Sequence, residues 1–105
     1  MSLDIAIEHL RDTGWSSLDT SGHTYSPEGR LYPTPERIRT EFQTLGRSLE
    51  IRRIDLFDCW RAEWADQNGS PEGAVVGQSE DEAAVHALAE LRRRLGIGIP
   101  SRSQT

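Results

Sequence analysis

The sequence predicts an α+β protein: a single small two-layer domain in which about three helices pack on an antiparallel sheet of about four or five strands. Two observations support this class. Residues 80–95 place apolar side chains at helical spacing and have capping residues at both ends. Residues 49–64 mostly alternate apolar and polar side chains, with the period of two that is typical of strands. Helices and strands are therefore segregated along the chain, which favours two packed layers.

Three helices are expected, over residues 3–13, 35–45 and 80–95. The last has the clearest signals, because Ser79 and Glu82 form a capping box and Gly96 supplies the left-handed residue that ends helices. Acidic residues fill its first turn and arginines fill its last turn, so both ends complement the helix dipole. The second helix begins at Thr34 and Pro35, a favourable N-cap followed by a preformed first helical residue.

Short strands are expected in the first half of the chain. Residues 15–18 read as a first strand, followed by turn residues at 19–22. Residues 25–32 read as two short strands about a Pro-Glu-Gly turn, with a tyrosine at each end. These strands are expected to join the sheet formed by the second half.

Longer strands are expected in the second half. The period of two begins at Leu49, and the pair Arg52-Arg53 shifts its phase, so we predict a bulge or a break there. Residues 54–64 then read as one long strand. Asp58 is the odd member of its apolar face, and we expect it to lie at a strand end or to hold an arginine such as Arg53 or Arg61. A loose hairpin connection over 68–73 leads to a last strand over 74–77.

Length and composition predict one globular domain over residues 1–98, with a sub-boundary near 46–48 and a flexible tail over 99–105. Charged residues make up 28% of the chain and hydrophobic residues 35%, which is typical of a folded protein. No apolar run approaches the ~20 residues of a membrane span, and no signal-peptide pattern is present. The single cysteine, Cys59, fits a reducing compartment. We therefore expect a cytoplasmic protein without a membrane partner.

The sequence offers no pattern that signals catalysis, a metal or a cofactor. Asp58 and Glu63 fall on opposite sides of a regular strand, so they do not form an acid–base pair there, and they do not favour a nucleophilic thiolate at Cys59. The glycines form no phosphate-binding loop. The residue types that bind zinc are isolated from one another in the sequence: His9, His23, His86 and Cys59. We predict a protein that is not an enzyme.

Residues 15–46 resemble the second half of a methyl-CpG-binding domain. The resemblance rests on Tyr25-Ser26-Pro27, Gly29-Arg30, Tyr32 and a helix over 36–42, which stand in that family's order. The resemblance implies a small twisted sheet that enters the major groove of DNA, with a helix packed behind the sheet. The positions that are basic in the family's strand fall near 19–24, where this chain has only His23. The residues that would contact DNA are His23, Tyr25, Arg30, Tyr32, Arg37 and Arg39.

Residues 58–95 resemble small phage-encoded proteins, among them anti-CRISPR-type inhibitors and the phage α-β-α sandwich family. An aromatic strand, a turn and a short strand precede the helix motif Ser79-x-x-Glu82-Ala83-Ala84 and its continuation to Leu88. The resemblance implies an acidic protein that blocks a host protein complex, in some cases by presenting carboxylates where a nucleic acid would bind.

The leading hypothesis is a non-catalytic macromolecule-binding protein, an inhibitor or accessory protein of a phage or mobile element that acts on a host protein or nucleoprotein complex. Its acidic faces would meet a basic surface. The residues expected to contact the partner are Glu72, Glu80, Asp81, Glu82, Trp60 and Trp64, although core positions are the favoured interpretation for the two tryptophans.

Two alternatives remain open from the sequence. One is DNA binding through the 25–32 hairpin and the arginines after it, which the net charge of −5 disfavours. The other is a homo-oligomeric structural protein, such as a homodimer, that pairs through an exposed strand edge or the tryptophan face.

Overall fold

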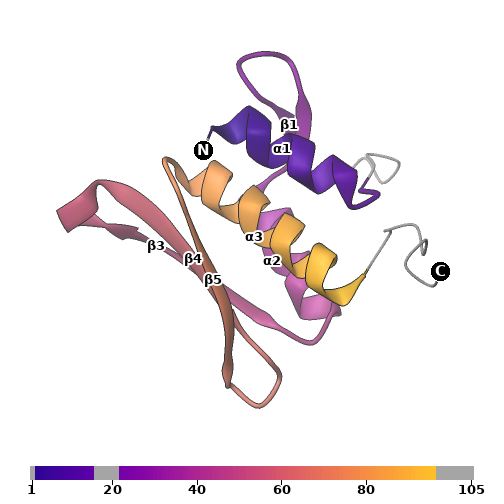
Figure 1. Ribbon diagram of the computed structural model, residues 1–105, viewed down its shortest axis with the longest axis vertical. Coiled ribbons are helices and arrows are strands. Elements are labelled where there is room, and N and C mark those ends of the chain that lie inside the picture. Colours follow the sequence, from indigo (N-terminus) through magenta and orange to yellow (C-terminus); the bar gives the residue numbers. More distant parts are fainter. Residues whose placement is uncertain (1, 16–21, 97–105) are drawn as a thin grey trace.

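A three-stranded antiparallel sheet and the helix packed on it form the centre of the protein (Figure 1). The computed structural model describes residues 2–15 and 22–96. The fold is α+β, as the sequence predicts. Its elements in chain order are α1 (Leu3–Asp12), β1 (His23–Tyr25), β2 (Leu31–Pro33), α2 (Pro35–Thr44), β3 (Ser48–Ile54), the 3-10 helix η1 (Asp55–Phe57), β4 (Cys59–Ala65), β5 (Pro71–Gly77) and α3 (Glu80–Leu95).

The strands divide into two sheets instead of forming one sheet of four or five strands. β1 and β2 form a separate hairpin, whereas β3, β4 and β5 form an antiparallel meander with β4 in the centre. Helix α3 contacts all three strands of the meander and also contacts α1 and α2. One face of the meander is therefore covered by helices, and no described helix covers the other face.

The register of the meander sets which side chains lie on each face. On the covered face Ala62 of β4 lies opposite Val75 of β5, and Ala62 is completely buried. On the other face Arg52 lies opposite Arg61, and Arg61 lies opposite Val76; all three are exposed. The alternation follows from the period of two, because successive side chains in a strand point to opposite faces.

Helix α3 begins and ends where its capping residues predict. The Ser79 hydroxyl accepts a hydrogen bond from the Glu82 N–H at 3.1 Å, and Gly96 adopts the left-handed conformation with φ of 73°. Small residues on its buried side, Ala83, Ala84 and Ala87, are completely buried, so the helix approaches its neighbours closely.

The other helices are also capped as expected. The Ser2 hydroxyl accepts from the Ile5 N–H at the start of α1, and the Thr34 hydroxyl accepts from the Arg37 N–H at the start of α2. Both helices end one residue earlier than the predictions of 13 and 45. Thr13 caps α1.

The β1–β2 hairpin confirms the predicted pair of short strands about the Pro-Glu-Gly turn. The Gly29 N–H donates to the Ser26 carbonyl at 2.8 Å and closes the turn. Of the strand expected over 15–18, only Trp15 is described, and it lies outside any strand. The rest of that strand, and the tail expected over 99–105, lie outside the described residues.

Two predictions for the second half are wrong. β3 runs without a break or bulge through Arg52-Arg53, and the bulge of the meander lies instead between Trp64 and Ala65. The predicted long strand over 54–64 is in fact two antiparallel strands, because the chain reverses over residues 55–58. Local alternation continues through this reversal, so the sequence pattern does not show it.

The position of Arg53 explains why the shift in the apolar alternation does not interrupt strand β3. Arg53 lies opposite Trp60 on the covered face of the sheet, yet its side chain is half-exposed. The β3–β4 hairpin extends beyond the helices at this end (Figure 1). A charged side chain therefore fits on a face that is apolar closer to the core.

Gly77 at the end of β5 sets how closely the sheet and α3 approach. A Cβ at this position would lie 2.7 Å from the backbone N of Ala83, which is closer than side chains and backbone pack. Because the obstructing atoms belong to helix backbone, the contact can be relieved only by moving α3 and β5 apart.

We predict that Gly77→Ala lowers the free energy of unfolding by about 1–3 kcal/mol, because the added methyl group overpacks this contact. Urea denaturation followed by circular dichroism measures the change. The control is Gln78→Ala at the adjacent exposed position, which is expected to change the value by less than about 0.5 kcal/mol. An unchanged midpoint for Gly77→Ala would show that the sheet and helix do not meet this closely.

Candidate protein-binding site

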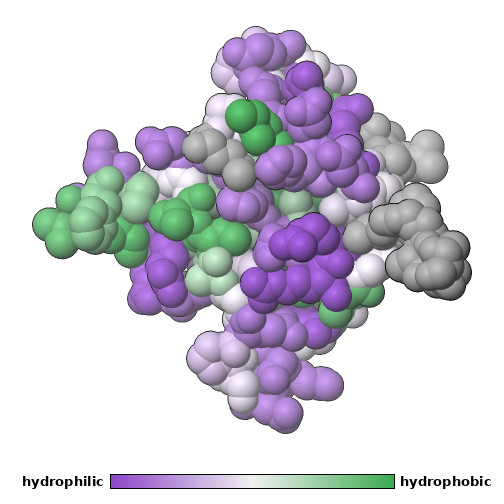
Figure 2. Space-filling model, viewed as in Figure 1, coloured by the Kyte–Doolittle hydropathy of each residue, from purple (hydrophilic) through white to green (hydrophobic). Residues whose placement is uncertain are grey.

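The most exposed large apolar side chains of the described residues lie together at the tip of the β3–β4 hairpin. Leu56 is 83% exposed and Phe57 is 72% exposed, and both belong to η1. We call this pair the tip patch. Figure 2 shows hydrophobic surface at the left, where Figure 1 places the hairpin tip. Burying such side chains is favourable by about 1.5–3 kcal/mol each, so their exposure calls for an explanation.

The backbone of the tip has a defined shape. Four residues connect the paired strands, since Ile54 lies opposite Cys59 in the register. Asp58 adopts the left-handed conformation with φ of 51°, and its N–H donates to the Asp55 carbonyl at 3.2 Å. Aspartate tolerates this conformation better than most residues, which favours Asp at this position.

Arg53 reinforces the turn from the adjacent strand. Its Nη2 donates to the Asp58 carboxylate at 2.5 Å, and its Nε lies 3.4 Å from the Asp55 carboxylate. The sequence predicts that Asp58 lies at a strand end or holds an arginine such as Arg53 or Arg61; in the structure Asp58 lies directly before β4 and pairs with Arg53. Exposed ion pairs add little stability, but two pairs on one arginine restrict how the turn can move. These contacts join the turn that carries the tip patch to the adjacent strand β3.

Trp64 belongs to the core, as the favoured interpretation of the sequence holds. It is 2% exposed, and its ring meets the Phe42 ring edge to face with centroids 5.6 Å apart. The Arg94 guanidinium covers the ring at 5.7 Å. Trp60 is half-buried and packs against the same core. The two tryptophans do not form an open platform.

The candidate acidic residues at the start of α3 make internal contacts. Asp81 accepts a hydrogen bond of 2.5 Å from the Tyr32 hydroxyl, and Glu80 lies 3.6 Å from the Arg39 guanidinium. Glu82 is 3% exposed. Of these three carboxylates, Glu80 is therefore the most accessible to a partner.

Glu72 is likewise engaged within the chain. Arg47 donates to both of its carboxylate oxygens at 2.9 Å, and this pair joins the segment after α2 to the start of β5. The hydrogen bonds from Arg47 hold the pKa of Glu72 below its ordinary value. The four acidic candidates do not form one free acidic face.

The candidate DNA-contacting arginines also lie beside carboxylates. Arg37 pairs with Glu41 at 3.1 Å, and Arg30 lies 3.8 Å from Asp4. Arg39 is the arginine that meets Glu80. Ion pairs of this kind lower the positive potential that phosphate binding requires.

The aromatic and histidine candidates of the β1–β2 hairpin are dispersed. Tyr25 is exposed, Tyr32 is buried, and His23 meets the Trp15 ring edge to face at 5.5 Å. The structure therefore does not gather the six DNA-contacting candidates into one surface.

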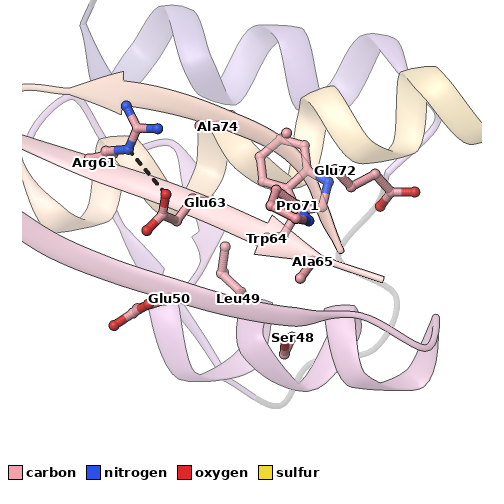
Figure 3. Close-up of a pocket in the computed structure, with 11 residues that line it drawn as sticks. Ser48, Leu49, Glu50, Arg61, Glu63, Trp64, Ala65, Pro71, Glu72 and Ala74 are labelled. Atoms are coloured by element: carbon pink, nitrogen blue, oxygen red, sulfur yellow. Dashed lines mark hydrogen bonds and ion pairs between the residues drawn. The ribbon is translucent and has the colours of Figure 1, made fainter. Parts of the chain in front are cut away.

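A shallow hollow of about 570 Å³ lies at the end of the meander away from the tip patch (Figure 3). Glu63 sits in it and receives two arginines, Arg52 at 2.7 Å and Arg61 at 3.3 Å. Figure 3 shows Arg61 turned toward Glu63. Ser48 also lines the hollow, but no histidine or cysteine does so among the described residues. The arrangement offers Ser48 no adjacent imidazole base.

A second hollow of about 360 Å³ lies between α1 and α3, and it brings His9 and His86 to one groove with Asp12 and Glu90. Within residues 2–15 and 22–96, no three His, Cys, Asp or Glu side chains are close enough to hold a metal ion. Arg93 and Arg94 both bind Glu90, which lowers the pKa of that carboxyl group. Glu90 is thus already engaged by cations of the chain.

Comparison with protein-family models, curated proteins and solved structures finds no match to this chain. In the part of the chain that the structure describes, no helix has the length and apolar character needed to cross a membrane. The function must therefore be argued from the surface itself.

Sequence reasoning missed the tip patch because it placed Leu56 and Phe57 inside a long strand. The signal that could have located it is Asp55-Leu56-Phe57-Asp58, in which two aspartates bracket the apolar pair. Aspartate is common in turns and uncommon in strand interiors.

The Tyr32–Asp81 contact generates a pH-dependent prediction. Burial, with Asp81 beside the phenol, raises the pKa of Tyr32 from 10.0 to about 12. The neutral phenol is thus favoured in the folded state, so its contribution to stability is present below pH 10 and is lost as the pH rises toward 12.

We predict that Tyr32→Phe lowers the free energy of unfolding at pH 7 by about 1.5–3 kcal/mol, as expected for a hydrogen bond to a charged group. It should also flatten the loss of stability between pH 10 and 12. Tyr25→Phe, at an exposed tyrosine, is the control and should leave both quantities unchanged. Urea titrations across this pH range measure them. Equal pH slopes in the wild-type and Tyr32→Phe proteins would contradict the assignment.

Proposed function

We propose that this protein is a non-catalytic binding protein that attaches to a partner protein through the tip patch. The observation that carries the proposal is the exposure of Leu56 and Phe57 on a turn in which Asp58 is left-handed and is paired with Arg53. A turn that is already formed before binding lowers the entropy lost on association, and burial of exposed apolar side chains favours binding.

The residues around the tip patch indicate the chemistry of the partner. Asp55 and Asp58 flank the apolar pair and are exposed; Arg53 pairs with both, so these three residues together leave an excess of one negative charge at the tip. The complementary site is an apolar pocket with basic residues at its rim, since rim charges steer association and fix orientation. The same carboxylates disfavour insertion of the tip into an anionic membrane surface.

The biological use that we propose is that of an inhibitor or accessory protein of a phage or mobile element, acting on a host protein complex in the cytoplasm. Small size and a net charge of −5 support a protein partner. Direct DNA binding is less well supported, because Arg30, Arg37 and Arg39 each lie beside a carboxylate.

We predict that the double substitution Leu56→Ser and Phe57→Ser abolishes partner capture without unfolding the protein, because both side chains lie outside the core. The measurement is quantitative mass spectrometry of proteins captured from a nuclease-treated bacterial host lysate. The matched control is Tyr25→Ser, which removes an equally exposed aromatic side chain from the other hairpin.

The wild type and Tyr25→Ser are expected to capture a stoichiometric protein partner. The double substitution is expected to reduce its recovery at least about tenfold, because a loss of about 1.4 kcal/mol of binding free energy already weakens binding tenfold. Equal recovery by all three proteins would rule out the tip patch. A partner lost upon nuclease treatment would instead favour DNA or RNA as the bridge.

A further inference from the structure

The outer edge of β5 has no paired strand among the described residues, and it is most accessible at Ala74 and Val76, which are exposed; Gly77 at its end is buried against α3. β5 is the last strand of the meander, and no further strand pairs with it among residues 2–15 and 22–96. Its regular pairing with β4 extends from Gly73, opposite Trp64, to Gly77, opposite Trp60. The edge N–H and C=O groups of such a strand can pair with another strand.

Residues 73–77 lack the features that usually protect an edge. Charged side chains, prolines and bulges prevent pairing with another chain. β3, the other edge of the meander, carries the exposed charges Glu50, Arg52 and Arg53. Residues 73–77 read Gly-Ala-Val-Val-Gly, with no charge and no proline.

The protected part of β5 ends just before this segment. Pro71 begins the strand, and Glu72 is the extra residue at the bulge, because Trp64 lies opposite Gly73 and Ala65 opposite Pro71. Arg94 of α3 also donates to the Glu72 carbonyl at 3.0 Å. An added strand can therefore pair from Gly73 onward but is excluded from Glu72.

The unprotected segment is nearly symmetric in sequence about Val75. If two copies pair antiparallel about Val75, Gly73 lies opposite Gly77 of the other copy, and Ala74 lies opposite Val76 of the other copy. A two-fold interface requires this self-complementarity. Every cross-chain pair then joins small uncharged residues, and Val76, which is 52% exposed, gains Ala74 of the other copy as a neighbour.

We propose that two copies of this chain pair antiparallel through residues 73–77 of β5 and so join two three-stranded meanders into one six-stranded sheet. The interface is short, so association depends on concentration. This interface lies at the β5 edge of the meander and contains neither Leu56 nor Phe57. It is therefore independent of the proposed attachment through the tip patch.

Sedimentation equilibrium over a wide concentration range tests the proposal. The wild type is expected to shift from a mass of 11.8 kDa toward twice that value. Val76→Lys should remain monomeric over the same range, because a charged side chain on an edge strand prevents pairing with another strand. Val76→Thr keeps a branched uncharged side chain and should associate like the wild type, and circular dichroism checks that each variant is folded.

The Leu56→Ser and Phe57→Ser protein separates the two surfaces and should still associate. A wild type that stays monomeric at every concentration would overturn the proposal. So would a protein whose association is lost on changing the tip patch and retained in Val76→Lys.

Cysteine cross-linking tests the register. In a Cys59→Ser background, Ala74→Cys and Val76→Cys proteins mixed together should form a disulfide-linked heterodimer, because directly opposite residues lie within disulfide range. Each variant alone should cross-link at least about tenfold more slowly, since a residue does not face its own copy in this register. Equal rates in the mixture and in either variant alone would contradict the pairing about Val75.

Discussion

The close approach of α3 to the end of β5 is the constraint on which the arrangement of the other elements depends. Gly77 leaves space for the helix backbone, and the alanines of α3 allow the neighbouring helices to pack against it. The helix covers only one face and one part of the meander. The face that no described helix covers, the β5 edge without a described partner strand and the projecting β3–β4 hairpin all follow from covering three strands with helices from one side.

Several charged side chains at the surface are paired with one another, whereas the apolar side chains of the tip patch are left exposed. The charged residues that stood out in the sequence bind one another: Glu72 with Arg47, Glu80 with Arg39, and Arg37 with Glu41. Leu56 and Phe57 have no such internal partner within the described residues and remain largely exposed. The physical case for binding therefore rests on the exposed apolar side chains of the turn, and less on the acidic face that the composition favours.

The three helices were predictable to within about a residue because capping acts locally: Ser79 and Gly96 bound α3 whatever lies around it. The reversal at 55–58 was not predictable from alternation, because the apolar period continues through it and only the pairing of Ile54 with Cys59 reveals it. The roles of the acidic candidates depend on contacts distant in sequence. Asp81 meets a tyrosine 49 residues away, and no local pattern contains that information.

A photo-reactive phenylalanine analogue placed at position 57 tests the central claim that the tip patch contacts another protein. The protein is expressed in the host cell, irradiated and denatured before analysis, so that only covalent contacts remain. The account predicts one predominant protein cross-linked from position 57, and little from the same analogue at Gln67, which is exposed near the other end of β4. Equal labelling from the two positions, or no protein cross-linked from position 57, would contradict the account.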